Sequence, residues 1–357
     1  MYIKENKKYS SILKSIKKFD FDEVNPYKEI NLNKIVDKFL KSLKEGDDEF
    51  SWLKEFNVDL YTKNKNANIH YGIPTHVHGN YKEGNIYLCL FNPSVSGIDD
   101  KVSTDVGIKG YYNSKTIDDY MKNNGIDSEV NNESDKIRKS LEEWLKGNES
   151  INQEDLNNKI CKYIISGESI LTREIKEIAP FIKNEYYTYT YLREVLKLPK
   201  LLISTKEKNY KTTNKVVNIE LCPFRSKNAN AVKKLSRTDY EKFSAYIIWY
   251  RIGKYLNDLE KDNNTEKPLF IFRSYYNKKS TDWKDILVDT LCEINKEEID
   301  SEIIKEYIKL FEREYFYIFN SQNGMISKDN LSYFDKNNEK KKISSKQFDE
   351  LRELVKQ

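Results

Sequence analysis

Small polar and charged side chains follow or end four apolar segments of this chain. Such groups can position a water molecule, bind a phosphate or hydrogen-bond to the edge of a base. Glu220 could also act as a general base or electrostatic stabiliser, or form an ion pair with Arg225 or Arg273. The full set is Asn92 and Ser94, Glu220 and Ser226, Arg273 and Ser274, and Asn320, Ser321 and Asn323.

The apolar segments that carry these groups predict buried β-strands. The first runs from Ile86 to Phe91 without a polar residue, and segments 216–224, 268–274 and 315–321 repeat the pattern. Helical stretches between strands are typical of βαβ units. The sequence therefore predicts an α/β fold with a central, mostly parallel four-stranded sheet flanked by helices. Ligands bind at the carboxyl ends of such strands.

Helical spacing and chain length predict the remaining organisation. Apolar stripes indicate helices near 35–43 and 156–164, and Thr238 and Glu241 form a capping box before a helix that runs to about 259. The first two strands are about 120 residues apart, which predicts a large helical insertion at about 113–198. We expect an N-terminal helical arm at 1–70, an α/β domain at 71–335 and a C-terminal helix within 336–357.

Composition narrows the possible functions. The 357 residues carry a net charge of +4, which permits nucleic-acid binding without requiring it. No G-x-S-x-G, G-x-x-x-x-G-K or G-x-G-x-x-G motif follows the first strand, which disfavours a hydrolase elbow, a nucleoside triphosphatase and a dehydrogenase. Without an apolar leader or an 18-residue apolar span, we expect a soluble cytoplasmic protein that makes no membrane contact. Lys340, Lys341 and Lys342 predict a solvated loop.

The four cysteines are widely spaced, so they do not indicate zinc, and Cys89 and Cys222 are expected to be reduced residues of the core. His76 and His78 form an H-x-H pair, whose rings would share one side of a strand and could bind a metal. Their alternatives are a hydrogen-bonded loop and a substrate contact. We expect no metal and no cofactor.

The first polar turn resembles a known family. Ile73-Pro74, Gly79-Asn80 and the run from Ile86 to Ser94, which reads IYLCLFNPS, are similar to the opening motif of the uracil-DNA glycosylase superfamily, in its divergent, loosely characterised branch. The resemblance implies that Asn92 positions the attacking water. Pro93 and Ser94 would shape the loop around the base.

Two later segments extend the resemblance. The second strand and its loop, NIELCPFRSKNA, imply that Glu220, Phe224 and Asn228 line the base pocket, with Phe224 stacking on the base. The last strand, followed by Asn320, Ser321 and Asn323, is similar to the family's second motif. It departs from that motif because Ser321 replaces a proline and no histidine is present. Asn320 could still donate one hydrogen bond.

The resemblance implies a DNA glycosylase that extrudes a base from double-stranded DNA and hydrolyses its N-glycosidic bond. Because of the insertion and the unusual last motif, we expect a modified base, with defence against phage DNA as a possible context. Phosphate contacts would come from Arg225, Lys227 and Arg273, with Asn323 at the minor groove. The alternatives are an inactive nucleic-acid-binding or regulatory module and a nucleoside hydrolase. The oligomeric state is not specified by the sequence.

Overall fold

The structure of the chain is a computed structural model, which describes twelve ranges of residues. The described residues are 7–45, 55–56, 74–92, 152–167, 191, 194–195, 215–224, 238–262, 265–276, 282–296, 299–321 and 325–356. Their elements, in chain order, are α1 (Lys7–Lys18), the 3-10 helix η1 (Phe21–Val24), α2 (Leu32–Glu45), β1 (Val77–His78), β2 (Ile86–Leu90), α7 (Gln153–Ile164), β3 (Ile165–Ser166), β4 (Val216–Glu220), α10 (Asp239–Leu259), β5 (Leu269–Phe272), α11 (Trp283–Ile294), α12 (Ser301–Tyr315), β6 (Phe316–Phe319), β7 (Leu331–Phe334), β8 (Lys340–Lys342) and α13 (Ser345–Lys356).

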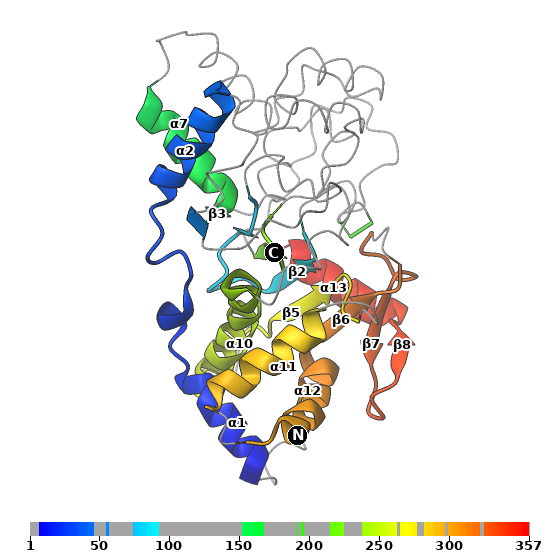
Figure 1. Cartoon of the computed structure of the whole chain (residues 1–357). Helices are drawn as coiled ribbons and strands as arrows, with labels where there is room; N and C mark the ends of the chain where they lie inside the picture. The colour runs from blue at the N-terminus through cyan, green and yellow to red at the C-terminus, as the bar shows by residue number, and fades with distance from the viewer. Residues whose placement is uncertain are drawn as a thin grey trace.

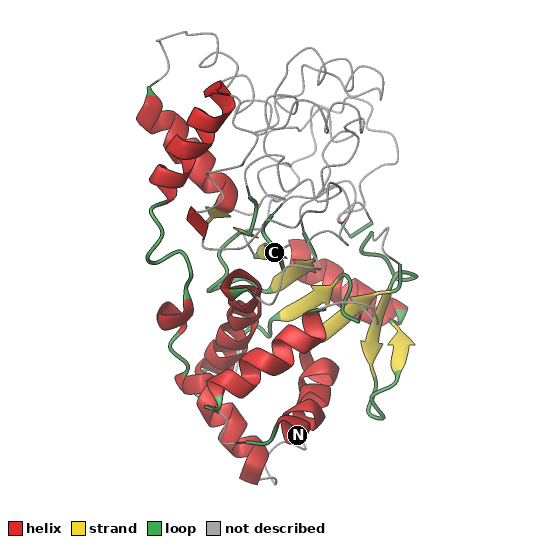
Figure 2. Ribbon diagram, viewed as in Figure 1, coloured by secondary structure: helices red, strands yellow, loops and turns green. Residues whose placement is uncertain are grey.

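All the described strands form one mixed sheet of eight strands, so the α/β class is confirmed. The strand order is β3-β1-β4-β2-β5-β6-β7-β8 (Figures 1 and 2). The segments predicted as strands supply β4, β2, β5 and β6, which are neighbours and pair in parallel. The sheet therefore has more strands than the four that were predicted. On one side β1 pairs with β4 in the antiparallel direction, and on the other β7 and β8 form an antiparallel extension.

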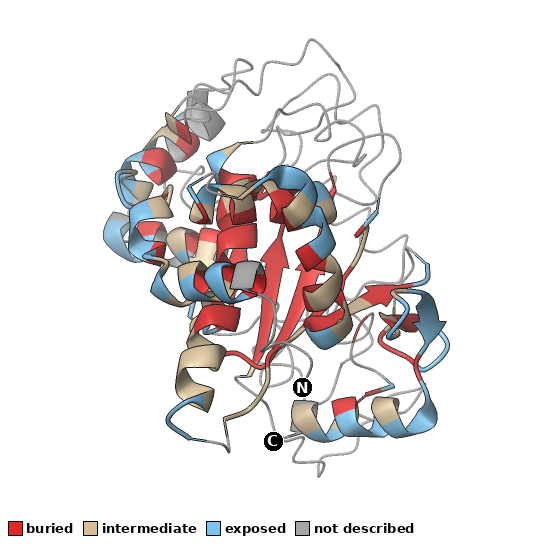
Figure 3. Cartoon of the chain, turned by 90° about the horizontal axis from the view of Figure 1, so that it is seen from below, coloured by how far each residue is buried: buried red, intermediate tan, exposed pale blue. Residues whose placement is uncertain are grey.

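Two apolar cores cover the two faces of the sheet, because successive side chains of each strand point to opposite faces. In β2, Tyr87 and Cys89 belong to the first core, with α10, α11 and α12. Ile86, Leu88 and Leu90 belong to the second core, which includes Leu351 of α13. The central strands are accordingly buried on both sides (Figure 3).

Helix α10 is the longest helix of the first core and follows the predicted capping box. The Thr238 side chain accepts from the Glu241 amide, and the Glu241 carboxylate accepts from the Thr238 amide. Gly253 lets α1 approach closely, since a Cβ atom there would lie 2.5 Å from the carbonyl oxygen of Ile16. Helix α1 thereby becomes part of the first core.

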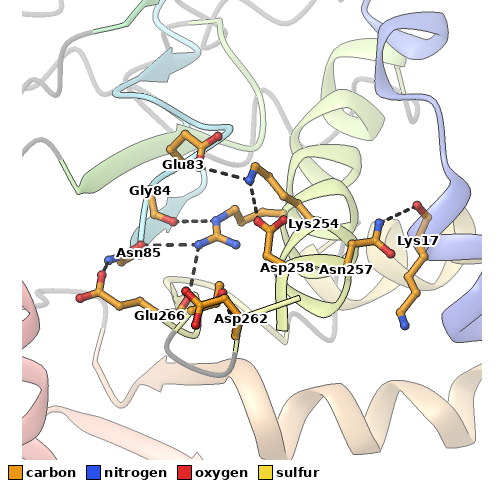
Figure 4. A network of polar contacts seen from close by, with 11 residues as sticks. Lys17, Glu83, Gly84, Asn85, Lys254, Asn257, Asp258, Asp262 and Glu266 are labelled. Carbon is orange, nitrogen blue, oxygen red and sulfur yellow. Dashed lines mark hydrogen bonds and ion pairs between the residues drawn. The ribbon is translucent and has the colours of Figure 1, made fainter. Parts of the chain in front are cut away.

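A polar network around buried Arg251 of α10 joins the segments that lead into three central strands. Figure 4 labels Gly84, Asn85 and Glu266 of this network. The Arg251 Nε donates to the Gly84 carbonyl at 2.8 Å, and the Arg251 Nη2 donates to the Asn85 side chain at 3.5 Å. Glu266 accepts from the Asn85 amide and forms an ion pair with Lys215. These residues precede β2, β5 and β4, so the network holds the edge of the sheet opposite to the strands' carboxyl ends.

Several boundaries differ from those expected. The expected domain boundary at 335 falls between β7 and β8, which pair with each other. Lys340–Lys342 forms the edge strand β8 and not the predicted loop. Its backbone completes the antiparallel ladder, while its side chains stay exposed. Within the expected insertion, the structure describes α7 and also the strand β3. Residues 113–151 of the expected insertion lie outside the described residues.

Candidate functional site

The carboxyl ends of β4, β2 and β5 lie at one level, and Asn92 follows β2 there. The ladder continues past the strands: the Leu221 amide donates to the Leu90 carbonyl at 3.0 Å, and the Arg273 amide to the Cys89 carbonyl at 2.8 Å. The Asn92 side-chain amide approaches the Phe224 carbonyl at 3.4 Å. The structure therefore brings Asn92 beside the end of β4.

The order of the parallel strands marks a topological switch point beside Asn92. From β2 the chain continues to β4 on one side, whereas β5 lies on the other side of β2. Crevices for ligands form at such points. Arg273 directly follows β5 at this edge of the sheet, and its Nη1 donates to the Tyr191 hydroxyl at 3.0 Å. The next residue, Ser274, has a φ of 61°, a conformation that non-glycine residues seldom adopt and that is enriched at functional sites.

Buried polar side chains continue from this edge along β4. Asn218 and Glu220 are 3% and 2% exposed, and both lie on the face of Val216, which belongs to the second core. Among the described residues, neither the Nδ2 nor the Oδ1 atom of Asn218 has a hydrogen-bond partner. A buried unsatisfied polar group costs about 1–3 kcal/mol. Asn218 therefore weakens the apolar core unless a ligand or a buried water completes its bonds.

The neighbouring strands add two more polar residues on the same face. His78 of β1 is the antiparallel register partner of Asn218, and Ser166 of β3 is the parallel partner of His78. Both are buried. On the opposite side of Asn218 the register partner is the apolar residue Leu88. We call Ser166, His78, Asn218 and Glu220 the polar row.

His76, by contrast, turns toward α10 and has a structural role. Its Nδ1 is 2.7 Å from the Tyr27 hydroxyl, and its Nε2 is 2.7 Å from Ser244 Oγ. Because the Ser244 hydroxyl donates to the Glu220 carbonyl at 2.9 Å, Nε2 must donate to Ser244 and Nδ1 must accept from Tyr27. Burial lowers the pKa of His76 to about 3, with a smaller contribution from His78. The hydrogen-bonded alternative for His76 is confirmed.

Three other expected site residues are engaged elsewhere. Phe224 is 1% exposed and packs edge-on against Phe56 and Tyr240, at ring-centroid distances of 5.4 and 5.8 Å. The Asn320 amide donates to the Asp329 carbonyl and accepts from the Ser332 hydroxyl. Ser321 bonds to the side chain of Asn330. Phe224 thus contributes to the core, and Asn320 and Ser321 hold the connection between β6 and β7.

The expected residues Pro93, Ser94, Arg225, Lys227, Asn228 and Asn323 lie outside the described residues. The sequence analysis missed Asn218, and for His78 it left a substrate contact as one alternative. The available signal was an asparagine in the middle of the apolar run VVNIEL. Such a residue must be hydrogen-bonded or functional when it is buried. For His78, only the pairing of β1 with β4 shows that it lies beside Asn218.

The scan against protein-family models and the searches of curated proteins and solved structures each found no match. Within the described ranges, no three His, Cys, Asp or Glu residues lie together as metal ligands would. Cys89 and Cys222 are buried free thiols, as predicted. None of the helices in the described part of the chain has the length and apolar content needed to cross a membrane.

Proposed function

We propose that this protein is a DNA glycosylase-like enzyme that binds an extruded nucleobase at the carboxyl edge of its parallel strands. The observation that carries this proposal is the buried carboxamide of Asn218, which has no hydrogen-bond partner in the described part of the chain and shares a sheet face with Glu220. A base edge presents adjacent donors and acceptors, which are the groups that a carboxamide can satisfy.

The neighbouring residues supply the chemistry of hydrolysis. Water positioned by the Asn92 side chain attacks C1′ of the sugar, the C1′–N bond breaks, and its electron pair stays on the base. One proton of the water finally neutralises the base, and the remaining hydroxyl stays on C1′. The Glu220 carboxylate stabilises the positive charge that develops on the sugar. Since the Asn92 amide is neutral, orientation and electrostatic preorganisation provide most of the acceleration.

Base release from a panel of duplexes tests this proposal. The panel contains uracil, the four normal bases and hypermodified cytosines, together with phage genomic DNAs. We expect the wild type to release one class of base and Asn92→Ala to lose at least about 100-fold in rate. Lys341→Gln, at an exposed edge-strand position, is the control that keeps the wild-type rate. Release that is equal in Asn92→Ala and in the wild type would contradict the role of Asn92.

One observation favours a second candidate, an inactive nucleic-acid-binding module. The Asn320 side chain is held by hydrogen bonds to the Asp329 carbonyl and to the Ser332 hydroxyl, so it has a structural role where the family's second motif would contact DNA. This module would bind DNA without releasing any base, and its affinity would survive Asn92→Ala. The same panel distinguishes the two candidates, provided that DNA binding is measured beside base release.

A further inference from the structure

We propose that His78 is a specificity-determining residue, which makes the third contact to a base held by Asn218. The inference rests on the proposed function, since it concerns the ligand of the same site. It assigns His78, from a two-residue strand near the sheet's edge, to the recognition of a planar heterocycle that presents a donor and an acceptor side by side.

The register of the sheet places the two side chains together. His78 and Asn218 are directly opposite each other in the antiparallel pair of β1 and β4. Side chains in this relation share one face, with Cβ atoms about 4.5–5.5 Å apart. His78 is 1% exposed and Asn218 is 3% exposed, so a ligand at one of them is within reach of the other in a dry environment.

The chemistry of a carboxamide explains why a third contact is needed. An amide that nothing else holds can rotate by 180° about its terminal bond, which exchanges its donor and its acceptor. It therefore fits a carbonyl beside an N–H, as in uracil, and equally an amino group beside a ring nitrogen, as in cytosine or adenine. Because no described residue holds either amide atom of Asn218 by a hydrogen bond, Asn218 alone does not distinguish these two classes of base.

His78 is placed to break this symmetry. Of the two residues opposite Asn218 on adjacent strands, Leu88 is apolar and His78 is polar. An imidazole nitrogen that bonds to a further group of the base fixes the direction in which the base lies, and with it the direction of the Asn218 amide. A hydrogen-bonding requirement of this kind excludes mismatched ligands far better than an apolar contact does.

Base selectivity is the quantity that tests the inference. Binding of uracil- and cytosine-containing duplexes, and of the free bases uracil, hypoxanthine, cytosine and adenine, is measured for the wild type, His78→Gln and His78→Phe. We expect the wild type to prefer one class by at least tenfold and both variants to reduce the ratio to about twofold or less. His70→Gln, at the histidine outside the described residues, serves as the control of matched residue type.

The small number of histidines allows a second measurement that needs no folded variant of His78. The chain has only three, so each imidazole gives a separate signal in a ¹⁵N–¹H spectrum of the wild type. On addition of the preferred base, the His78 signals are expected to shift, whereas those of His76, held between Tyr27 and Ser244, stay in place.

The outcomes separate the two proposals. Binding that depends on Asn218 but leaves the His78 signals and the selectivity ratio unchanged would overturn the role of His78 and leave the proposed function intact. If no duplex and no free base binds to the wild type, both proposals are wrong. Selectivity that falls in His78→Gln, together with a base-induced shift of the His78 signals, supports both.

Discussion

At the scale of single residues, His76 and His78 have different surroundings, although only one residue separates them in the chain. His76 completes a hydrogen-bond chain from the Tyr27 hydroxyl through Ser244 to the Glu220 carbonyl. Because Nδ1 accepts from the Tyr27 hydroxyl, it carries no proton, so this arrangement requires the neutral ring. His78 lies opposite Asn218 on the other face. The hydrogen bonds that begin at Tyr27 thus hold the backbone of β4 on the face of the first core. The polar row lies on the face of the second core.

The lowered pKa of His76 gives stability a predictable dependence on pH. Its folded pKa of about 3 is below the unfolded value of 6.5, so the unfolded state gains the proton first as the pH falls. The contribution of neutral His76 is complete above pH 6.5 and decreases by up to about 1.4 kcal/mol per pH unit between 6.5 and 3. Urea unfolding of the wild type and of His76→Gln, at pH 7.5 and at pH 5, measures this contribution to the unfolding free energy.

The difference in unfolding free energy between the wild type and His76→Gln should be smaller at pH 5 than at pH 7.5. Taking this difference removes the contributions of the carboxylates and of the other two histidines, which both proteins share. A difference that stays constant between the two pH values would show that His76 titrates normally in the folded protein.

At the scale of elements, close backbone contacts explain how the N-terminal segment joins the core. Helix α1 crosses α10 at Gly253, where only a hydrogen atom fits beside the Ile16 carbonyl. In the segment after α1, Tyr27 hydrogen-bonds to His76. Helix α2 then packs against α7, and the Asn157 side-chain amide donates a hydrogen bond to the Asp37 carboxylate at 2.8 Å (Figure 1). The N-terminal segment therefore contacts both the helices of the first core and the α7–β3 unit.

Gly253→Ala tests the contact between α1 and α10. An alanine within a helix normally gains up to about 1 kcal/mol over glycine, but here the added Cβ would meet a backbone oxygen and α1 would have to move. We expect a net loss of about 1–2 kcal/mol in unfolding free energy. Gly167→Ala, where a Cβ would have no neighbour within 4 Å, should change it by less than about 0.5 kcal/mol. Equal effects at the two positions would contradict this account.

The parts of the fold that could be predicted are those with strong local patterns. The four apolar runs became the parallel strands, and the capping box at Thr238 begins α10. The strands β1 and β3 have only two residues each and exist through pairing with distant segments, which no local pattern encodes. The place of Asn92 at the end of a strand could be predicted from such a local pattern, whereas the proximity of His78 to Asn218 depends on the register of two strands.

At the scale of the whole molecule, the sheet has one edge that is protected by charge. Strand β8 ends the sheet order, and the side chains of Lys340, Lys341 and Lys342 are exposed. Edge strands present unpaired backbone groups that can pair with another chain, and lysines oppose such pairing by repulsion. This explains the lysine run by its place in the fold, with no ligand required.

Replacing Lys340, Lys341 and Lys342 together by threonine should therefore promote self-association. Size-exclusion chromatography with light scattering measures the mass of the wild type and of the triple variant. We expect the variant, but not the wild type, to form larger species as its concentration rises. Lys346→Thr in α13, also a loss of positive charge but outside strand β8, is the control. A triple variant with the mass of the wild type at every concentration would refute the protective role.

The measurement that tests the central claim most directly is the effect of Asn218→Leu on stability and ligand binding in the same preparation. If Asn218 is kept for a ligand, an apolar side chain of similar size should raise the unfolding free energy by about 1–3 kcal/mol while base binding and release are lost.

Asn85→Leu is the matched control for this measurement. Asn85 is also buried, but its amide donates to Glu266 and accepts from Arg251, so the substitution should lower stability. The account predicts opposite signs at the two asparagines. A loss of stability in Asn218→Leu similar to that in Asn85→Leu, or base release that continues in Asn218→Leu, would contradict the claim that Asn218 is a ligand-binding group.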